Sequence, residues 1–500
     1  MLNISFYQKS HDSKAAIAFI CFENLLLSEE AQAFDQAHGG FLKRALDNNR
    51  FKGKKNETLM LTPPSDAPSS RIVLLGLGKA EHLTIETLQH AGGTLVTALR
   101  PTPDTAVEIH AGSFAANRHK ASDVAAHMAF GAQLRHWRFD KYRTTEEADK
   151  KPALQSLAVL LPEADLAHKT YEPLEQVAHG VCLARSLISE PPNVLYPASY
   201  AERLQELKSL GVKVEILGQE DLEKLGMNAL LGVAQGSIRE AKVVVLQWMN
   251  GPKDQKPLAF VGKGVTFDTG GISLKPSSGM GDMKYDMGGS AIVAGLIRAL
   301  AGRKAKVNAV GVLGLVENMP SGSAQRPGDV VKSMSGQTIE IIDTDAEGRL
   351  VLADALWYAQ DRFKPELMID LATLTGAITF TFGNHYAGLF SNNDPLCAQL
   401  TKAGESVGEC LWRLPLGEKY DREINSDIAD VKNLGPRGKG GSITAAQFLL
   451  RFVNNVPWAH LDIAGVTWSE KGLPIADKGA TGYGVQLLNQ FVLEHYESKG

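Results

Sequence analysis

Three acids and an arginine alternate with small residues where a predicted strand gives way to a predicted helix, and this junction constrains the fold most. DTDAEGRL, residues 343–350, places Asp343, Asp345, Glu347 and Arg349 at every second position. Before it, TIEII (338–342) is rich in β-branched residues and predicts a buried strand. After it, LVLADALWYAQ (350–360) predicts a mostly apolar helix. Sheets of α/β domains bind ligands at such carboxyl ends of strands.

If residues 343–349 are extended, the four charged side chains project to one side, because side chains alternate along a strand. A solvated strand face is the alternative interpretation. That face needs a hydrophobic opposite side to hold the strand down, and Thr344, Ala346 and Gly348 do not supply one. The pattern therefore favours a ligand-binding segment of an α/β domain.

A second charged stretch, FVGKGVTFDTGGISLKPSSGMGDMKYDMGG (260–289), starts in a predicted buried strand. Its eight glycines let the backbone approach a ligand closely. Its charged residues are Lys263, Asp268, Lys275, Asp282, Lys284 and Asp286. Such charges need partners, because burying an unpaired charge is costly.

Ion pairs between lysines and acids would satisfy these charges, and divalent metal ions are the other explanation. Asp268, Asp286, Asp345 and Glu347 would repel one another if they converged without cations. The sequence has no histidine between His179 and His385, so lysine amines are the available nitrogen ligands. Oxygen ligands suit Mg²⁺, Mn²⁺ or Ca²⁺ and tolerate Zn²⁺.

An EF-hand calcium loop fits this stretch less well. Counted from Asp343, the first acids and Gly348 match that loop, but Asp354 stands where its bidentate glutamate belongs. The entering segment also predicts a strand instead of a helix.

The whole chain predicts two α/β domains, since 500 residues exceed one ordinary core and 44% of them are hydrophobic. We expect a smaller amino-terminal α/β domain over residues 1–165, which shapes an oligomer. A linker helix over 166–190 then leads to a larger carboxy-terminal catalytic α/β domain over 191–500. Its central, mostly buried sheet is flanked by helices. Buried strands are predicted at RIVLLGLG (71–78) and PLAFVGKGV (257–265), and helices at 171–189 and SAIVAGLIRALAG (290–302).

Charge and composition disfavour several other classes. A net charge of −4 gives no general attraction to nucleic acid or anionic membranes. Four widely spaced cysteines without a CxxC pair indicate a reducing, cytoplasmic compartment. No apolar run approaches the length of a bilayer span. AAIAFICF (15–22) could be a signal-peptide core, but Asp12 and Glu23 beside it favour a first core strand.

Two shorter motifs have ordinary structural interpretations. GLGK (76–79) lacks the spacing of a phosphate-binding loop and predicts a turn after a buried strand. RHWRFDKYR (135–143) mixes basic and aromatic residues as single-strand binders do, but Asp140 dilutes it and long basic side chains often pack over aromatic rings.

Together the two charged stretches resemble those of the leucyl aminopeptidase family, dinuclear-metal exopeptidases that release amino-terminal residues. DTDAEGRL is similar to the family's central signature, and VGKGVTFDTGGISLKP with DMKYDMGG is similar to its other metal segment. LATLTGA (371–377), GGSITAAQFLLRFV (440–453) and WAHLDIAG (458–465) match in order. The resemblance is clear over roughly residues 175–490 and weak over the amino-terminal part.

The resemblance implies two divalent ions per subunit, Mn²⁺ or Zn²⁺. Lys263, Asp268, Asp286 and Glu347 would hold one, and Asp268, Asp345 and Glu347 the other, so that Asp268 and Glu347 bridge. Lys275 would polarise the scissile carbonyl, and Arg349 would hold a bicarbonate ion that acts as the base. The pocket for a leucine-like side chain would be formed by Met283, Thr373, Leu374, Gly376 and Ala464.

Two positions depart from the family pattern. Asp343 stands where asparagine is usual, and Thr467 stands where an apolar residue lines the pocket in relatives. The resemblance also implies peptide substrates, a cytoplasmic location and a homohexamer of two stacked trimers. DNA binding, a second role of some bacterial relatives, is the alternative of a different class. The acidic balance argues against it unless assembly creates a basic groove.

Overall fold

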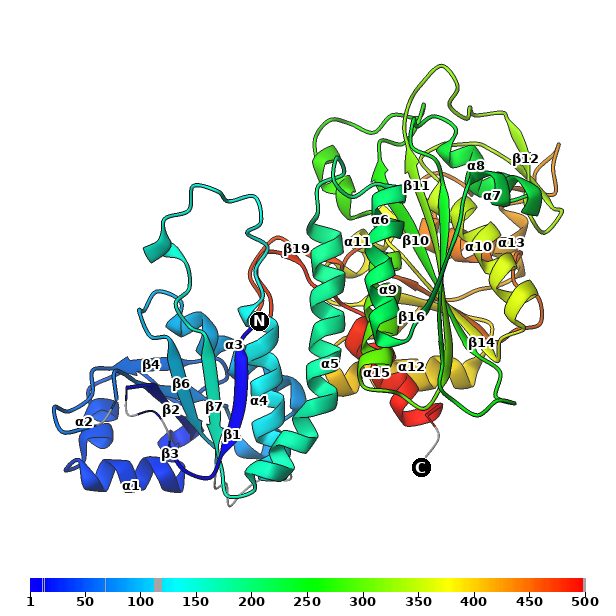
Figure 1. The fold of residues 1–500 in the computed structure, drawn as a ribbon. Coiled ribbons are helices and arrows are strands. Elements are labelled where there is room, and N and C mark those ends of the chain that lie inside the picture. The colour runs from blue at the N-terminus through cyan, green and yellow to red at the C-terminus, as the bar shows by residue number, and fades with distance from the viewer. Residues whose placement is uncertain (11, 13, 68, 112–118, 498–500) are drawn as a thin grey trace. The chain divides into compact units, whose positions relative to one another are not determined.

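The computed structural model describes residues 1–10, 12, 14–67, 69–111 and 119–497. The chain forms two compact units. One comprises Met1–Ala178 with Lys471–Lys478, and the other comprises His179–Glu470 with Gly479–Gly500. The expected architecture of two α/β domains, the smaller at the amino terminus, is confirmed (Figure 1).

The first unit is built on a seven-stranded sheet in the order β1-β7-β6-β2-β5-β4, with β3 paired to β2. Its strands pair in parallel except at β4 and β3. The run AIAFICF is buried throughout as β2, which confirms the core strand expected there. The strands are β1 (Asn3–Tyr7), β2 (Ala16–Phe22), β3 (Leu26–Leu27), β4 (Thr58–Leu61), β5 (Ile72–Gly76), β6 (Ala106–His110) and β7 (Ser156–Leu160).

Two helices of this unit, α3 (Ile85–Leu99) and α4 (Ala121–His136), pack closely against each other. A side chain at Gly92 would place its Cβ 1.9 Å from the carbonyl oxygen of Met128, so only glycine permits this approach. The other helices of the unit are α1 (Glu29–Ala37), α2 (Phe41–Asp47), η2 (Ala80–His82), η3 (Ala148–Lys150) and η1 (Glu23–Leu25).

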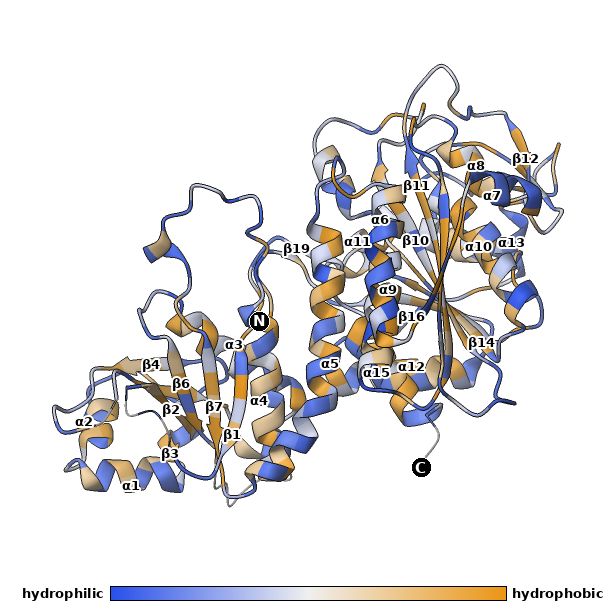
Figure 2. Cartoon of the chain, in the orientation of Figure 1, coloured by the Kyte–Doolittle hydropathy of each residue, from blue (hydrophilic) through white to orange (hydrophobic). Residues whose placement is uncertain are grey.

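The second unit contains an eight-stranded mixed sheet in the order β16-β15-β18-β14-β10-β11-β9-β8. Its centre, β18-β14-β10-β11, is parallel, and the strands there are almost wholly buried, as expected. Figure 2 shows the hydropathy of the residues along the chain. The strands are β8 (Lys213–Leu217), β9 (Lys242–Met249), β10 (Leu258–Asp268), β11 (Asn308–Asn318), β14 (Leu367–Ala372), β15 (Ala387–Ser391), β16 (Leu411–Arg413) and β18 (Trp458–Asp462).

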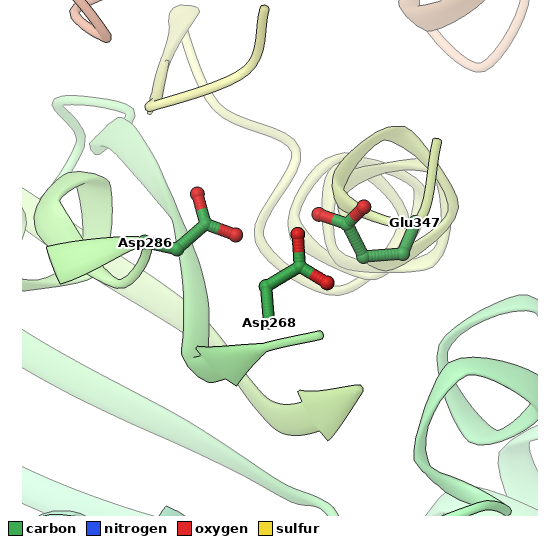
Figure 3. A group of neighbouring side chains, drawn as sticks. All are labelled: Asp268, Asp286 and Glu347. Carbon is green, nitrogen blue, oxygen red and sulfur yellow. The ribbon is translucent and has the colours of Figure 1, made fainter. Parts of the chain in front are cut away.

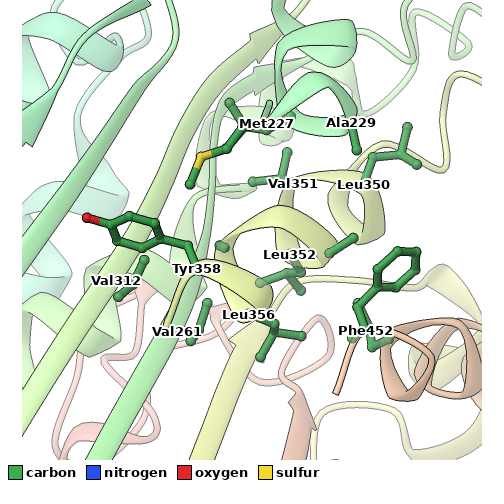
Figure 4. Close-up of a cluster of buried hydrophobic side chains, with 14 of the residues drawn as sticks. Met227, Ala229, Val261, Val312, Leu350, Val351, Leu352, Leu356, Tyr358 and Phe452 are labelled. Carbon is green, nitrogen blue, oxygen red and sulfur yellow. The ribbon is translucent and has the colours of Figure 1, made fainter. Parts of the chain in front are cut away.

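Helices cover both faces of this sheet. On one face α9 packs so closely that Gly262 of β10 lies against Ser290, and on the other α10 and α8 form a large apolar core with the strands (Figures 1 and 4). The helices are α5 (Ala164–Ser189), α6 (Pro197–Arg203), η4 (Leu204–Leu210), α7 (Gln219–Leu225), α8 (Asn228–Ala234), η5 (Met280–Tyr285), α9 (Gly288–Gly302), α10 (Gly348–Phe363), α11 (Gly376–Phe382), α12 (Asp394–Val407), α13 (Glu418–Arg422), α14 (Gly441–Leu450) and α15 (Val485–His495).

A small three-stranded sheet, β12-β13-β17, lies beside the main one and positions the chain that follows it. Its strands are β12 (Val330–Lys332), β13 (Thr338–Glu340) and β17 (Val431–Lys432), and a two-stranded sheet joins β19 (Trp468–Ser469) to β20 (Gly479–Ala480). Among the described helices, none is both long enough and apolar enough to cross a bilayer.

Two sequence predictions need correction. Residues 343–347 form a turn instead of an extended segment, and α10 already begins at Gly348. The turn closes because the backbone N–H of Asp345 donates to the Asp343 carboxylate at 3.0 Å, a local bond that competes with strand geometry. The helix expected over 171–189 begins at Ala164, because Pro173 is accommodated inside it.

Candidate metal centre

Asp268 lies at the carboxyl end of β10, and each of its two carboxylate oxygens has a partner. Its Oδ1 accepts hydrogen bonds from the Asn318 side chain at 2.8 Å and from the Gly270 backbone N–H at 2.9 Å. Its Oδ2 contacts the ammonium group of Lys275 at 2.8 Å. Because Oδ1 is already bonded to fixed donors, the carboxylate is oriented before any ligand arrives.

Lys263 occupies the middle of β10 and is almost fully buried. Its Nζ donates to Asp286 Oδ1 at 2.8 Å and to the carbonyl oxygen of Thr373 at 2.9 Å, and it contacts Glu347 Oε1 at 2.8 Å. A Cβ at position 348 would lie 2.6 Å from Lys263 Cε, so glycine is needed where α10 begins.

Asp286 lies between η5 and the start of α9, where the unpaired N–H groups of a helix favour negative charge. The Thr373 hydroxyl donates to Asp286 Oδ1 at 2.7 Å. Asp286 Oδ2 is buried and has no hydrogen-bond partner among the described residues. A buried carboxylate oxygen without a donor is suited to a cation.

The turn and first helical residues over 341–349, here called the ligand loop, bring the remaining acids to the same place. Thr344 Oγ1 donates to the carbonyl oxygen of Gly270, and Ser273 N–H donates to Thr344 Oγ1 at 2.9 Å. These bonds join the ligand loop to the glycine-rich loop after β10, so the two charged stretches meet at one place. Glu347 is buried, so the solvated-face alternative is wrong.

Asp268, Asp286 and Glu347 point toward one another, with ligand oxygens that all lie within 4.8 Å (Figure 3). Asp345 adjoins them through its ion pair with Lys275. The ion-pair alternative is therefore partly correct, since both lysines are paired. Two lysines cannot balance the four carboxylates, however, and the cluster keeps a surplus of negative charge that divalent cations would neutralise.

Three of the four acids have raised pKa values, and burial is the main cause, whereas nearby Lys263 and Lys275 hold the pKa of Glu347 below its usual value. Burial raises the pKa of Asp286 well above its usual range despite nearby Lys263. Burial, with the Glu347 and Asp268 carboxylates, raises the pKa of Asp345 to about 7. Burial alone would lower the pKa of Lys263, but Asp286 and Glu347 outweigh it and raise that pKa. Without added cations the acids therefore compete for protons.

Arg349 extends from the first turn of α10 and is buried. Its Nη1 donates to the carbonyl oxygen of Asn433 at 2.8 Å, while its Nε has no hydrogen-bond partner among the described residues. Burial lowers the pKa of its guanidinium to about 10, against the opposing effect of Glu347. A buried guanidinium with a free donor can hold an anion.

One cavity of about 480 Å³ opens onto this cluster. It is lined by every residue that the sequence suggested as a metal ligand, by Lys275, and by Met283, Thr373, Leu374, Gly376 and Ala464. Arg349 is not part of the lining. Thr467 also does not line it, since Thr467 is fully buried and its hydroxyl donates to the carbonyl oxygen of Ile463 at 2.8 Å.

Sequence reasoning missed other residues of the site. Tyr285 and Met280 line the cavity, and Tyr285 stacks on Trp468 with ring centroids 5.5 Å apart. Tyr285 stands inside DMKYDMGG, so its position between two suggested site residues was an available signal. Asn318 and Asn433 offered no such signal, because each lies far along the chain from the acids that it supports.

Comparison with known proteins identifies the relationship. The cytosol aminopeptidase family matches with its catalytic-domain model over residues 182–489 and with its N-terminal-domain model over residues 18–146. The chain belongs to the cytosol aminopeptidase family. It is therefore a hydrolase of the exopeptidase class, and the suggested resemblance to this family is confirmed.

Relatives of this family match nearly the whole chain. A "probable cytosol aminopeptidase" of Caulobacter vibrioides is 54% identical over 485 residues, which is 97% of each protein. Another, of Rhizobium etli, is 51% identical over 480 residues, covering 95% of this chain and 96% of that protein. Among solved structures, the bottromycin maturation enzyme BotP in complex with Mn has a TM-score of 0.83 and 33% identity, covering 95% of this chain and 98% of that one.

Proposed function

We propose that this chain is a metal-dependent aminopeptidase that removes amino-terminal leucine-like residues from peptides. The observation that carries the proposal is the surplus of buried carboxylates around one cavity in a member of the cytosol aminopeptidase family. The donors suit Mn²⁺ or Zn²⁺, because they are carboxylate oxygens with one buried lysine amine. The unpartnered Asp286 Oδ2 supports this fit.

The proposed ligands divide between two ions. Lys263, Asp268, Asp286 and Glu347 would hold one, and Asp268, Asp345 and Glu347 the other. Lys263 would bind as a neutral amine, so loading of the site would release its proton. When bound, two divalent ions lower the pKa of a nearby water and stabilise developing negative charge.

The protein groups around the ions have separate tasks. Lys275, which lines the cavity and forms ion pairs with Asp268 and Asp345, would polarise the scissile carbonyl. Arg349 would hold a bicarbonate ion that takes up the proton, and its unpartnered Nε supports this role. Met283, Thr373, Leu374, Gly376 and Ala464 would receive the apolar side chain of the substrate. Selection of free amino termini follows if the substrate amine must reach the metal site.

The remaining features of the proposal concern assembly and location. We propose a cytoplasmic homohexamer in which residues 1–165 shape the oligomer, residues 166–190 link the domains and residues 191–500 carry the peptidase. Sedimentation of the purified chain tests the hexamer. The DNA-binding alternative has its own test, because retardation of DNA in a gel at low salt would support it and its absence would remove it.

The activity is tested with leucyl p-nitroanilide beside its N-acetylated form. The protein is stripped with a chelator and then given Mn²⁺ or Zn²⁺. Activity that returns with metal, and only on the free amine, supports the aminopeptidase. No hydrolysis with either metal would contradict the proposal.

A further inference from the structure

Asn433 lies one residue beyond β17 and is fully buried. β17 pairs in parallel with β13, and Lys432 is opposite Glu340. The chain after β13 continues directly into the ligand loop. The parallel register therefore places Asn433 beside the first residues of that loop, although more than eighty positions separate them in the sequence.

The side chain of Asn433 makes four hydrogen bonds to the backbone of the ligand loop. Its Oδ1 accepts from the N–H groups of Ile342 at 2.7 Å and Asp343 at 3.4 Å, and its Nδ2 donates to the carbonyl oxygens of Asp343 at 2.7 Å and Ala346 at 3.3 Å. Both ends of one amide thus bracket the turn that carries Asp345. An amide suits this place because it donates and accepts at once.

The backbone of Asn433 also forms hydrogen bonds to residues on both sides of this turn. Its N–H donates to the carbonyl oxygen of Glu340 at 3.0 Å, just before the loop, and its carbonyl oxygen accepts from Arg349 Nη1 at 2.8 Å, at the end of the loop. One buried residue therefore contacts the ligand loop before, within and after its metal-binding segment.

We propose that Asn433 is a positioning residue that sets the ligand loop for metal binding and catalysis. The inference rests on the proposed function. Asn433 itself is not among the residues that line the cavity, so it acts through Asp345, Glu347 and Arg349. Groups that orient metal ligands in this way change metal affinity or activity by roughly 10- to 100-fold when they are removed.

A second buried asparagine provides a matched control. Asn308 Oδ1 accepts from the N–H of Gly251 at 2.9 Å, and its Nδ2 donates to the carbonyl oxygens of Pro252 at 2.8 Å and Gln255 at 2.9 Å. Asn308 starts β11, whereas Asn318, which contacts Asp268, ends it. At about 3.3 Å per residue, this places the control on the order of 30 Å from the site.

The experiment compares Asn433→Ala with Asn308→Ala in the full-length protein. Each change removes a side-chain amide whose oxygen accepts from backbone N–H groups and whose nitrogen donates to two backbone carbonyl oxygens, most of them partly buried. Mn²⁺ affinity is measured by calorimetry on metal-free protein, and kcat and KM are measured on leucyl p-nitroanilide with saturating Mn²⁺. Urea unfolding gives the stability of each variant.

We expect both variants to lose stability, but only Asn433→Ala to bind Mn²⁺ about 10- to 100-fold more weakly and to lose kcat by a similar factor. KM should change little, because the pocket residues are untouched. Wild-type Mn²⁺ affinity and kcat in folded Asn433→Ala would overturn the proposal, and so would equal losses in Asn308→Ala.

Asn433→Ser is used in the same measurements if Asn433→Ala does not fold, and the same results decide. The two proposals also fail separately. If wild-type protein binds Mn²⁺ but cleaves no amino-terminal bond, the proposed function fails. The calorimetric comparison of the asparagine variants still tests the positioning role.

Discussion

Buried acids occur in two places in the second unit, around Asp268 at the end of β10 and at Asp370 in β14, yet only the first resembles a ligand site. Asp370 is opposite His460 of β18, and both are fully buried. His460 Nδ1 lies 2.6 Å from Asp370 Oδ1, and the Trp458 indole donates to Asp370 Oδ2 at 2.7 Å. Asp370 therefore has a partner at each oxygen.

The cluster around Asp268 differs in charge balance and in access. Four carboxylates share two lysines, one carboxylate oxygen of Asp286 has no donor in the described part of the chain, and a cavity reaches the group. In the other group, Asp370 is hydrogen-bonded to His460, and the Asp462 carboxylate also acts on that histidine. Burial alone would lower the pKa of His460, but Asp370 outweighs it and raises that pKa, which favours a charged pair. Burial of an acid is thus weak evidence for a ligand site, whereas an unbalanced and accessible group of acids is stronger evidence.

Removal of a shared acid should have the largest effect on function. In Glu347→Ala, both proposed sites lose a ligand and Lys263 loses one partner, so we expect loss of both ions and activity below detection. Metal content after dialysis and hydrolysis of leucyl p-nitroanilide check this. Retention of two tightly bound ions would contradict the bridging role of Glu347.

Removal of the negative charge from the Asp370–His460 pair should affect stability instead of metal binding. Asp370→Asn leaves the buried His460 without its carboxylate, and breaking such a pair costs roughly 3–5 kcal/mol of unfolding free energy. Metal content and kcat per folded molecule should stay as in the wild type. Asp286→Asn is the matched control, for which we expect metal loss. If the two variants behaved alike in urea unfolding and metal content, the distinction between the clusters would be wrong.

Substitution of Lys275 distinguishes a role in catalysis from a role in balancing the charge of the proposed metal ligands. Lys275→Ala removes the group proposed to stabilise the developing oxyanion, and loss of one such donor costs about 10²- to 10³-fold in kcat. The ligands remain, so two Mn²⁺ ions should still bind. Calorimetry and steady-state kinetics check this, and loss of metal would mean that Lys275 supports the ligands instead.

Asp354 represents a third kind of buried acid, one whose carboxylate accepts hydrogen bonds from backbone N–H groups. Leu230 and Met334 donate to it at 2.9 and 2.8 Å, and burial raises its pKa to about 7 despite these donors. A raised pKa in the folded state makes its contribution to stability complete below the unfolded value near 3.9 and lost as pH rises through about 7. The unfolding free energy of the wild type should therefore fall from pH 5 to pH 8.

Asp354→Asn should lose less stability than the wild type over the same pH interval, which urea unfolding of both proteins at the two pH values measures. The comparison between the proteins isolates Asp354 from other titrating groups. Equal slopes would show that Asp354 titrates well below pH 7 in the folded protein.

Local patterns predicted much of the fold. The apolar runs at 16–22, 72–76 and 258–265 became buried strands because a sheet covered on both faces requires continuous apolar residues. The helix predicted over 171–189 begins earlier, at Ala164. The turn at 343–347 was missed because alternation of charged and small residues also fits a loop whose side chains bond to its own backbone.

The sequence by itself determined the chemistry of the candidate site, since the two motifs fix oxygen ligands, two lysines and an arginine at particular positions. Only the tertiary structure decided which of these acids share a cavity, that Asp286 Oδ2 lacks a donor, and that Asn433 brackets the ligand loop. The physical reason is how far along the chain each kind of information reaches. Side-chain periodicity reports a few neighbouring residues, whereas parallel strand pairing joins residues such as Glu340 and Lys432 that are far apart in the chain.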